Sequence, residues 1–221
     1  MKVILFGATG MVGQGVLREC LRDDGIEGVL AVGRSSTGQT HEKLRELIRK
    51  DLFDFGGADA DLQGYDACFF CLGVSSAGMN EADYTHLTFD LTMGWAHTLA
   101  EINPAMTFVY VSGAGTGGKA MWAQVKGRTE DALLGLFPSA YMFRLGALRA
   151  MHGEVSKTRW TRIAYAVFRP LMPLLWAIAP GAVISTEELG RAMIRAARQG
   201  ARKRVLENRD LRALGTPLSE T

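Results

Sequence analysis

Apolar residues in this chain form short runs, and these alternate with longer segments in which they recur at helical spacing. A short apolar run bounded by turn residues is typical of a buried strand, and recurrence every three to four residues is typical of an amphipathic helix. We therefore predict strands at 2–6, 29–32, 66–72, 106–111, 140–143 and 204–206, and helices at 14–21, 59–62, 81–102, 121–137, 185–199 and 210–214.

Strands that alternate with helices at this spacing predict right-handed crossovers and a parallel sheet. One segment is ambiguous. Residues 43–50 match a helix by periodicity, but a third strand is due at this place in the chain, and we favour the strand. The prediction is an α/β fold with a doubly wound parallel sheet, a Rossmann fold, in a single domain over residues 1–221. For the helix at 185–199 we predict Thr186 as the N-terminal cap, followed by acidic residues in the first turn.

Composition narrows the function classes. The chain has 221 residues, of which 48% are hydrophobic and 22% charged, and a formal net charge of +2. These values are ordinary for a globular protein and give no case for nucleic acid as a partner. The three cysteines are too few for a disulfide framework, and we see no signal peptide, so we expect a reducing, cytoplasmic setting.

Cys68 and Cys71 match the spacing of a metal or redox motif. They lie in a predicted strand, where residues three apart point to opposite faces of the sheet. We therefore expect no metal site and no redox pair here, and we expect Cys20 to be a packed side chain on the first helix.

The clearest motif is a glycine pattern at the start of the chain. Gly7, Gly10 and Gly13 follow the first predicted strand and open the first predicted helix. Glycine permits a tight turn and a close backbone approach, and the N-terminus of the helix favours a phosphate. Strand, glycine turn and helix together predict a dinucleotide-binding site at the carboxyl ends of the strands.

The end of the second predicted strand indicates which dinucleotide is bound. An acidic residue there would bind the ribose 2′-hydroxyl, but this chain has Arg34 and Ser35. A guanidinium suits a phosphate, so the sequence favours NADP over NAD. Asp51 follows the ambiguous third strand, where its carboxylate would accept a hydrogen bond from the adenine amino group, and a solvated turn aspartate is an equal alternative.

Candidate chemistry follows the fourth and fifth predicted strands. Gly73 ends the fourth and would let the backbone pass close to the cofactor. Ser112 ends the fifth, where its hydroxyl is expected to point into the cleft near the nicotinamide. Trp122 and Lys126 lie on the next helix, four residues apart and hence on one face.

Together these residues resemble the short-chain dehydrogenase/reductase superfamily, in its atypical or extended branch, near the epimerase-like and Tat-interacting-oxidoreductase-like members. The resemblance covers residues 2–147. It rests on the three glycines, Arg34, Asp51, the segments 71–73 and 124–127, and Ser112. It implies binding of a nicotinamide dinucleotide through Gly7, Thr9, Gly10, Met11, Val12, Gly13, Arg34, Ser35, Asp51, Leu52, Cys71, Leu72, Gly73 and Lys126.

The family performs its chemistry with a serine, a tyrosine and a lysine, the last two spaced Y-x-x-x-K. Ser112 and Lys126 match, and the resemblance implies that they hold the substrate carbonyl and the nicotinamide ribose. Trp122 occupies the tyrosine position, and an indole cannot exchange a proton near neutral pH. Residues considered as replacement acid/base groups, none with a compelling spacing, are Tyr84, Tyr110, His86 and His152.

Residues 147–185 correspond to the substrate lid of the family. Within and just beyond this region, residues 170–186 carry no charge and include three prolines, a pattern that argues against a membrane-spanning helix. An apolar lid favours an apolar substrate. A buried pair of helices under the edge of the sheet is an alternative for this stretch, and residues 159–184 also suit contact with a membrane surface or a protein. The chain is expected to be a monomer or a homodimer.

Two functions follow from these residues. The first is an NADP-dependent oxidoreductase or epimerase-like enzyme acting on a small apolar carbonyl or alcohol. The second is a catalytically silent NADP(H)-binding sensor or interaction scaffold, which the missing tyrosine favours.

Overall fold

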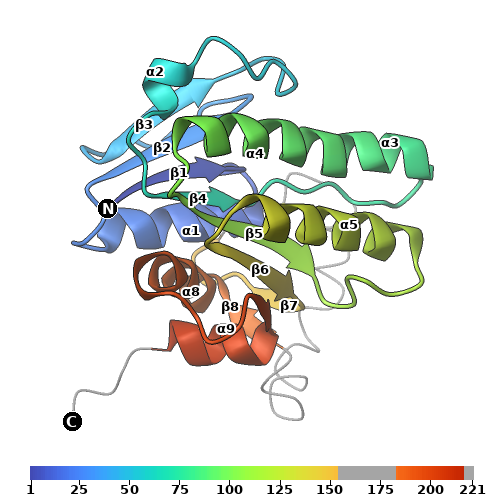
Figure 1. Ribbon diagram of the computed structural model, residues 1–221. Helices are drawn as coiled ribbons and strands as arrows, with labels where there is room; N and C mark the ends of the chain where they lie inside the picture. Colours follow the sequence, from blue (N-terminus) through green and yellow to red (C-terminus); the bar gives the residue numbers. More distant parts are fainter. Residues whose placement is uncertain (154–182, 217–221) are drawn as a thin grey trace.

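A computed structural model describes residues 1–153 and 183–216 (Figure 1). Its main element is a seven-stranded sheet in which every pair of neighbouring strands is parallel. The strand order is β3-β2-β1-β4-β5-β6-β9. The strands are β1 (Lys2–Phe6), β2 (Gly28–Gly33), β3 (Leu44–Ile48), β4 (Ala67–Phe70), β5 (Thr107–Gly113), β6 (Ala140–Leu145) and β9 (Val205–Glu207). The predicted parallel, doubly wound sheet is therefore confirmed, and the ambiguous segment is the strand β3.

Helices cover both faces of this sheet (Figure 1). One face carries α1 (Met11–Arg22) and α8 (Thr186–Gln199), with α9 (Asn208–Gly215) beside them; the other carries α4 (Leu91–Ile102) and α5 (Met121–Leu136). Side chains alternate along each strand, so each face contributes to its own apolar cluster. In β1, for example, Val3 and Leu5 face α1, whereas Ile4 and Phe6 face α4.

The two cysteines of the C-x-x-C segment show the same alternation. Cys68 belongs to the cluster under α4, and Cys71 packs against the cluster under α1. The prediction that they point to opposite faces is confirmed. Cys20 is fully buried on α1, as expected.

The helix predicted at 81–102 is continuous but not uniform. Helix α3 (Glu81–Thr85) leads into a π-helical segment, His86–Asp90, before α4 begins. The apolar spacing predicts a helix over the whole segment and does not reveal the π-helical part. A π-helical turn holds about one residue more than an α-helical turn, and over such a short segment this changes the spacing too little to be visible in the sequence. The predicted short helix at 59–62 is α2 (Asp59–Leu62).

The N-cap of helix α8 lies one residue before the predicted cap, because the helix begins at Thr186 itself. Ser185 is the N-cap: its hydroxyl accepts from the backbone N–H of Glu188, and the Glu188 carboxylate accepts from the Ser185 N–H. This reciprocal capping box satisfies two donors at the start of the helix. The assignment of the cap to Thr186 was therefore wrong, because Ser185 has the extended backbone that an N-cap needs.

Two short strands, β7 (Ala147–Arg149) and β8 (Val183–Ser185), pair in parallel as a separate sheet. They flank residues 154–182, so most of the proposed lid and the apolar stretch lies outside the described residues. Within the described ranges, no helix is both long and apolar enough to cross a membrane.

Candidate functional site

The order of the strands reverses between β1 and β4, and the carboxyl ends of the two strands meet the glycine turn there. Ligands of doubly wound sheets bind at such a switch point. Gly7 has a φ of +80°, a conformation that L side chains rarely adopt, and a Cβ on it would lie 2.8 Å from the carbonyl carbon of Cys71. The turn is closed by the Gly10 N–H, which donates to the Gly7 carbonyl over 2.9 Å. Gly7 therefore needs both its dihedral freedom and its small size.

Gly13 serves close packing within the same turn. A Cβ on this residue would overlap the carbonyl oxygen of Gly7. The first turn of α1 is thereby held directly against the end of β1. Gly10 is the N-cap of α1 and provides no side-chain cap, so the first N–H groups of the helix are left for an anion.

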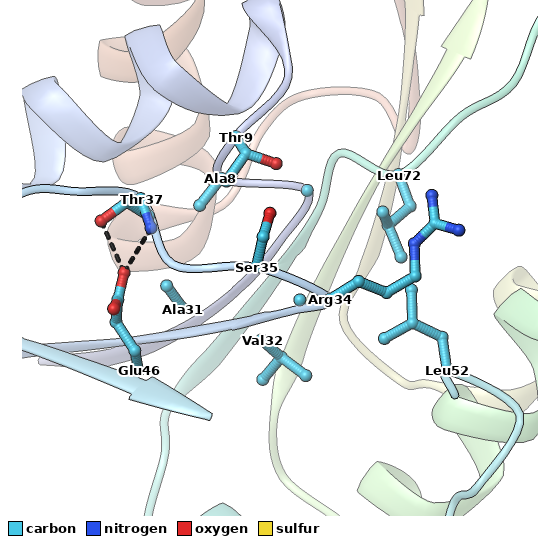
Figure 2. Close-up of a pocket in the computed structure, with 12 residues that line it drawn as sticks. Ala8, Thr9, Ala31, Val32, Arg34, Ser35, Thr37, Glu46, Leu52 and Leu72 are labelled. Atoms are coloured by element: carbon cyan, nitrogen blue, oxygen red, sulfur yellow. Dashed lines mark hydrogen bonds between the residues drawn. The ribbon is translucent and has the colours of Figure 1, made fainter. Parts of the chain in front are cut away.

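A pocket opens beside this turn, at the carboxyl ends of β1 and β2 (Figure 2). Six of the predicted cofactor residues line it: Gly7, Thr9, Arg34, Ser35, Leu52 and Leu72. The lining residues that sequence reasoning missed are Ala8, Ala31, Val32, Gly33, Thr37 and Glu46. Ala31 and Val32 could have been found from the sequence, because they lie at the end of a predicted buried strand. Glu46 could not, because it lies within β3 and enters the pocket only through sheet pairing.

The other predicted cofactor residues do not line this pocket. They are Gly10, Met11, Val12, Gly13, Asp51, Cys71, Gly73 and Lys126. Asp51 forms a turn: its Oδ1 accepts from the Phe53 N–H over 2.9 Å, and the neighbouring Leu52 is the residue that lines the pocket. Trp95, fully buried on α4, fixes this segment by donating its indole N–H to the Leu52 carbonyl over 2.8 Å.

Arg34 and Ser35 lie at the end of β2, where the sequence placed them. Figure 2 shows the Arg34 side chain extending along the side of the pocket lined by Leu52 and Leu72. Thr37 and Glu46 lie on the opposite side of the pocket. The two walls thus carry opposite charges, a guanidinium on one and a carboxylate on the other.

Ser112 lies at the end of β5, but its hydroxyl is not free. The side chain is buried, and Oγ donates to Oε1 of Glu130 over 2.5 Å. Arg144 binds the same carboxylate, with Nη2 donating to Oε2 over 2.7 Å and Nε donating over 3.1 Å. Helix α5 therefore places a carboxylate against this hydroxyl, and the expectation that it points into the cleft near the nicotinamide stays a prediction.

Lys126 and Trp122 share one face of α5, as predicted. The Lys126 ammonium lies 3.5 Å from the Val111 carbonyl oxygen and 5.6 Å from the centroid of the Tyr110 ring. Burial lowers the pKa of Lys126 to about 8, and the nearby Glu130 carboxylate offsets part of this effect. The Trp122 ring lies beside the end of β5 and the turn that follows: it would be 3.5 Å from a Cβ on Gly113 and 3.7 Å from a Cβ on Gly115.

The tyrosines considered as replacement acid/base groups are buried. Tyr110 is 1% exposed and Tyr84 is 2% exposed, and burial raises the pKa of both phenols. A raised pKa makes a tyrosine a poorer proton donor near neutral pH. Neither tyrosine is placed in the pocket.

The two histidines considered for the same role lie outside the pocket. The His86 ring stacks on Phe53 at 4.1 Å between centroids, and its Nδ1 lies 3.3 Å from Asp90 Oδ2. His152 Nε2 lies 2.6 Å from Glu187 Oε1. In the described ranges, no group of histidine, cysteine and carboxylate side chains has the geometry of a metal site.

The topology and the glycine turn define a Rossmann-type fold, which solved nucleotide-sugar epimerases share. Two solved structures illustrate this likeness. UDP-glucose 4-epimerase from Thermotoga maritima, with UDP-glucose, has a TM-score of 0.69 at 15% identity, covering 94% of this chain and 76% of that one. UDP-glucuronic acid 4-epimerase from Bacillus cereus, in complex with NAD, has a TM-score of 0.68 at 13% identity, covering 94% and 78%. The likeness confirms the fold.

Two named proteins are similar in sequence. HTATIP2 from Rattus norvegicus is 27% identical over 198 residues, covering 87% of this chain and 79% of the relative. The mitochondrial protein FMP52-1 from Scheffersomyces stipitis is 26% identical over 176 residues, 77% of each chain. No protein-family profile matches the chain. The similarity to HTATIP2 agrees with the Tat-interacting-oxidoreductase-like resemblance found from the sequence.

The fungal relatives correct one expectation. FMP52-1 and the related proteins from Meyerozyma guilliermondii and Aspergillus oryzae are all named mitochondrial. The cytoplasmic location inferred from the cysteines is overturned by these names. The physical reason is that free thiols indicate a reducing compartment but do not indicate which reducing compartment it is.

Proposed function

We propose that this protein is an NADP(H)-binding oxidoreductase or epimerase-like enzyme that acts on a small, apolar carbonyl or alcohol. The observation that carries the proposal is the pocket at the switch point, where the glycine turn, Arg34 and Ser35 meet. Solved neighbours of the same fold bind NAD, which supports a nicotinamide dinucleotide as the cofactor class. Such a cofactor supplies hydride transfer, and the protein supplies binding and orientation.

The residues present suit the charged parts of that cofactor. Gly7 and Gly13 keep side chains out of the turn, and the uncapped N-terminus of α1 offers N–H groups to a pyrophosphate. Arg34 and Ser35 provide a guanidinium and a hydroxyl for a ribose 2′-phosphate. The preference for NADP over NAD rests on these two side chains.

Lys126 and Ser112 are the candidates at the nicotinamide end. In this proposal Lys126 holds the nicotinamide ribose, and Trp122 shapes the wall beside it. Ser112 can polarise a substrate carbonyl only if its hydroxyl leaves Glu130, because a serine has one proton to donate. Water or a residue not yet identified supplies the reaction proton. An apolar substrate is favoured by the uncharged residues 170–186.

The proposal is tested by titrating the protein with NADPH and NADH in parallel and following energy transfer from tryptophan. NADPH is expected to bind more tightly, and Arg34→Ala should weaken NADPH binding and leave NADH binding nearly unchanged. Arg45→Ala is the matched control, because Arg45 is an exposed arginine that pairs with Asp61 outside the pocket. If neither NADPH nor NADH binds, the proposal is refuted.

A catalytically silent sensor or scaffold is a second candidate, favoured by two observations. Trp122 replaces the proton-transferring tyrosine, and the Ser112 hydroxyl is bound to Glu130. This candidate predicts cofactor binding without turnover, and weak carbonyl reduction after Trp122→Tyr. If wild type already oxidises NADPH with a carbonyl substrate, the silent candidate is wrong. Loss of this activity in a Ser112→Ala protein that is still folded and still binds NADPH supports the role of Ser112 in the enzyme.

A further inference from the structure

The wall of the pocket opposite Arg34 contains a carboxylate, that of Glu46, which accepts several hydrogen bonds (Figure 2). Oε1 of Glu46 accepts from both the backbone N–H and the hydroxyl of Thr37, each over 2.6 Å. Oε2 accepts from the Ser36 hydroxyl over 2.7 Å. Three donors from the loop after β2 therefore converge on one side chain of β3, as Figure 2 shows for Thr37.

Backbone N–H groups of the same loop hold the two hydroxyls in place. The Gly38 N–H donates to the Ser36 hydroxyl over 3.0 Å, and the Gln39 N–H donates to the Thr37 hydroxyl over 3.2 Å. Both hydroxyls are thereby directed with their protons toward Glu46. Hydroxyls and backbone N–H groups at the end of the second strand are the donors that a 2′-phosphate would take. Here an internal carboxylate already takes them.

This carboxylate is negatively charged at neutral pH. The hydrogen bonds from Thr37 and Ser36 lower the pKa of Glu46 below its usual value. Arg34 and Glu46 both line the pocket, one attracting a phosphate and the other repelling it. Ribose with a free 2′-hydroxyl is neutral at that atom, so NAD(H) would not experience the same repulsion.

We propose that Glu46 is a specificity-determining residue that limits the preference of this pocket for a 2′-phosphorylated dinucleotide. It acts by repelling the phosphate and by withholding from it the two donors of Thr37, which lines the pocket. The inference rests on the proposed function, since it assigns a role within the same pocket. Arg34 and Glu46 then determine the ratio of NADPH to NADH affinity in opposite directions.

The experiment measures dissociation constants for NADPH and NADH with wild type and with Glu46→Gln, which keeps the shape and removes the charge. We expect the ratio of NADPH to NADH affinity to rise about fivefold, mostly through tighter NADPH binding. The increase in this ratio should be smaller in 0.5 M salt, because at about this ionic strength the repulsion between charges is screened over a few ångströms. A merely structural role would change both affinities together and would not depend on salt in this way.

Matched variants separate charge from structure. Asp24→Asn removes one negative charge from an exposed residue before the start of β2, at the end of the strand away from the pocket, and should leave the ratio unchanged. Thr37→Val removes one donor but keeps the Glu46 charge, so the ratio should not rise. If Glu46→Gln does not fold, Glu46→Thr gives the same test, because threonine is neutral and suited to a strand.

The outcomes distinguish this inference from the proposed function. If wild type binds neither dinucleotide, the proposed function fails and the inference fails with it. If wild type binds a dinucleotide but the neutral variants leave the ratio unchanged or lower it, the role of Glu46 is overturned and the proposed function stands. A higher ratio in either neutral variant, but not in Asp24→Asn, supports the role of Glu46.

Discussion

Ser112 donates its hydroxyl proton to Oε1 of Glu130 over 2.5 Å, and this glutamate side chain is only 2% exposed. Arg144 donates to both oxygens of the same carboxylate, most closely to Oε2 over 2.7 Å. Ser112, which the sequence predicts to bind the substrate, therefore also has a structural role, because its hydroxyl helps to stabilise a buried charge. A buried charge is tolerated when it is paired and hydrogen-bonded.

Replacing Ser112 by alanine should therefore destabilise the fold. Removal of the hydroxyl leaves Oε1 of the buried carboxylate with only the 3.2 Å hydrogen bond from Arg144 Nε, and loss of a hydrogen bond to a charged group costs about 1–3 kcal/mol in the free energy of unfolding. Urea unfolding followed by circular dichroism measures this. Ser139→Ala is the control, because Ser139 is half-buried near the start of β6, and it should change the free energy by less than about 0.5 kcal/mol. Equal values for the two variants would contradict the structural role of Ser112.

Arg144→Met should be more damaging than loss of a surface ion pair. It leaves Glu130 as an uncompensated buried charge, at a cost of about 3–5 kcal/mol. Arg45→Met, which breaks the exposed pair with Asp61, should cost less than about 1 kcal/mol. The same unfolding assay compares them. The double variant Glu130→Gln/Arg144→Met should recover part of the loss, and a purely additive result would show that the two side chains do not interact.

The lowered pKa of Lys126 predicts that the free energy of unfolding increases at alkaline pH. The pKa of Lys126 is lowered to about 8 in the folded state, against an ordinary value of 10.5. Between these values the unfolded chain binds more protons than the folded one, so the free energy of unfolding should increase from pH 8 to pH 10.5. The increase from this residue is up to about 3 kcal/mol.

The measurement compares the pH dependence of unfolding in wild type and in Lys126→Met. The variant should lack the alkaline increase, because it has no ammonium to deprotonate. Lys119→Met, which removes an exposed lysine, should keep it. If the Lys126→Met curve runs parallel to that of wild type over this range, the shifted pKa is wrong.

Two glycine-to-alanine substitutions in helices should have opposite effects. Gly13→Ala adds a Cβ that overlaps the Gly7 carbonyl, which should cost about 1–3 kcal/mol and weaken dinucleotide binding. Gly135→Ala lies near the end of α5 with no atom within 4 Å of the added Cβ, and it should stabilise the protein by about 0.4–1 kcal/mol. Thermal unfolding and NADPH titration of both variants check this. A Gly13→Ala protein as stable as Gly135→Ala would show that the turn tolerates a side chain.

Local sequence determined the elements and the turn of this fold. The alternation of apolar runs with helical spacing predicted the parallel sheet, and the three glycines predicted the turn that Gly7 and Gly13 make. Such features depend on residues that are neighbours in the chain, so their periodicity and backbone preferences are visible in the sequence. Arg34 and Ser35 were found for the same reason, since they follow directly on a predicted strand.

Only the tertiary structure decided which side chains meet. Ser112, Glu130 and Arg144 come from β5, α5 and β6, and Glu46 reaches the pocket because β3 pairs with β2. Moving one strand by a single residue would turn Glu46 to the other face, while the local pattern of each strand would be almost the same. The sequence by itself thus determined where a dinucleotide site should form, and the register of the sheet decided which charges surround it.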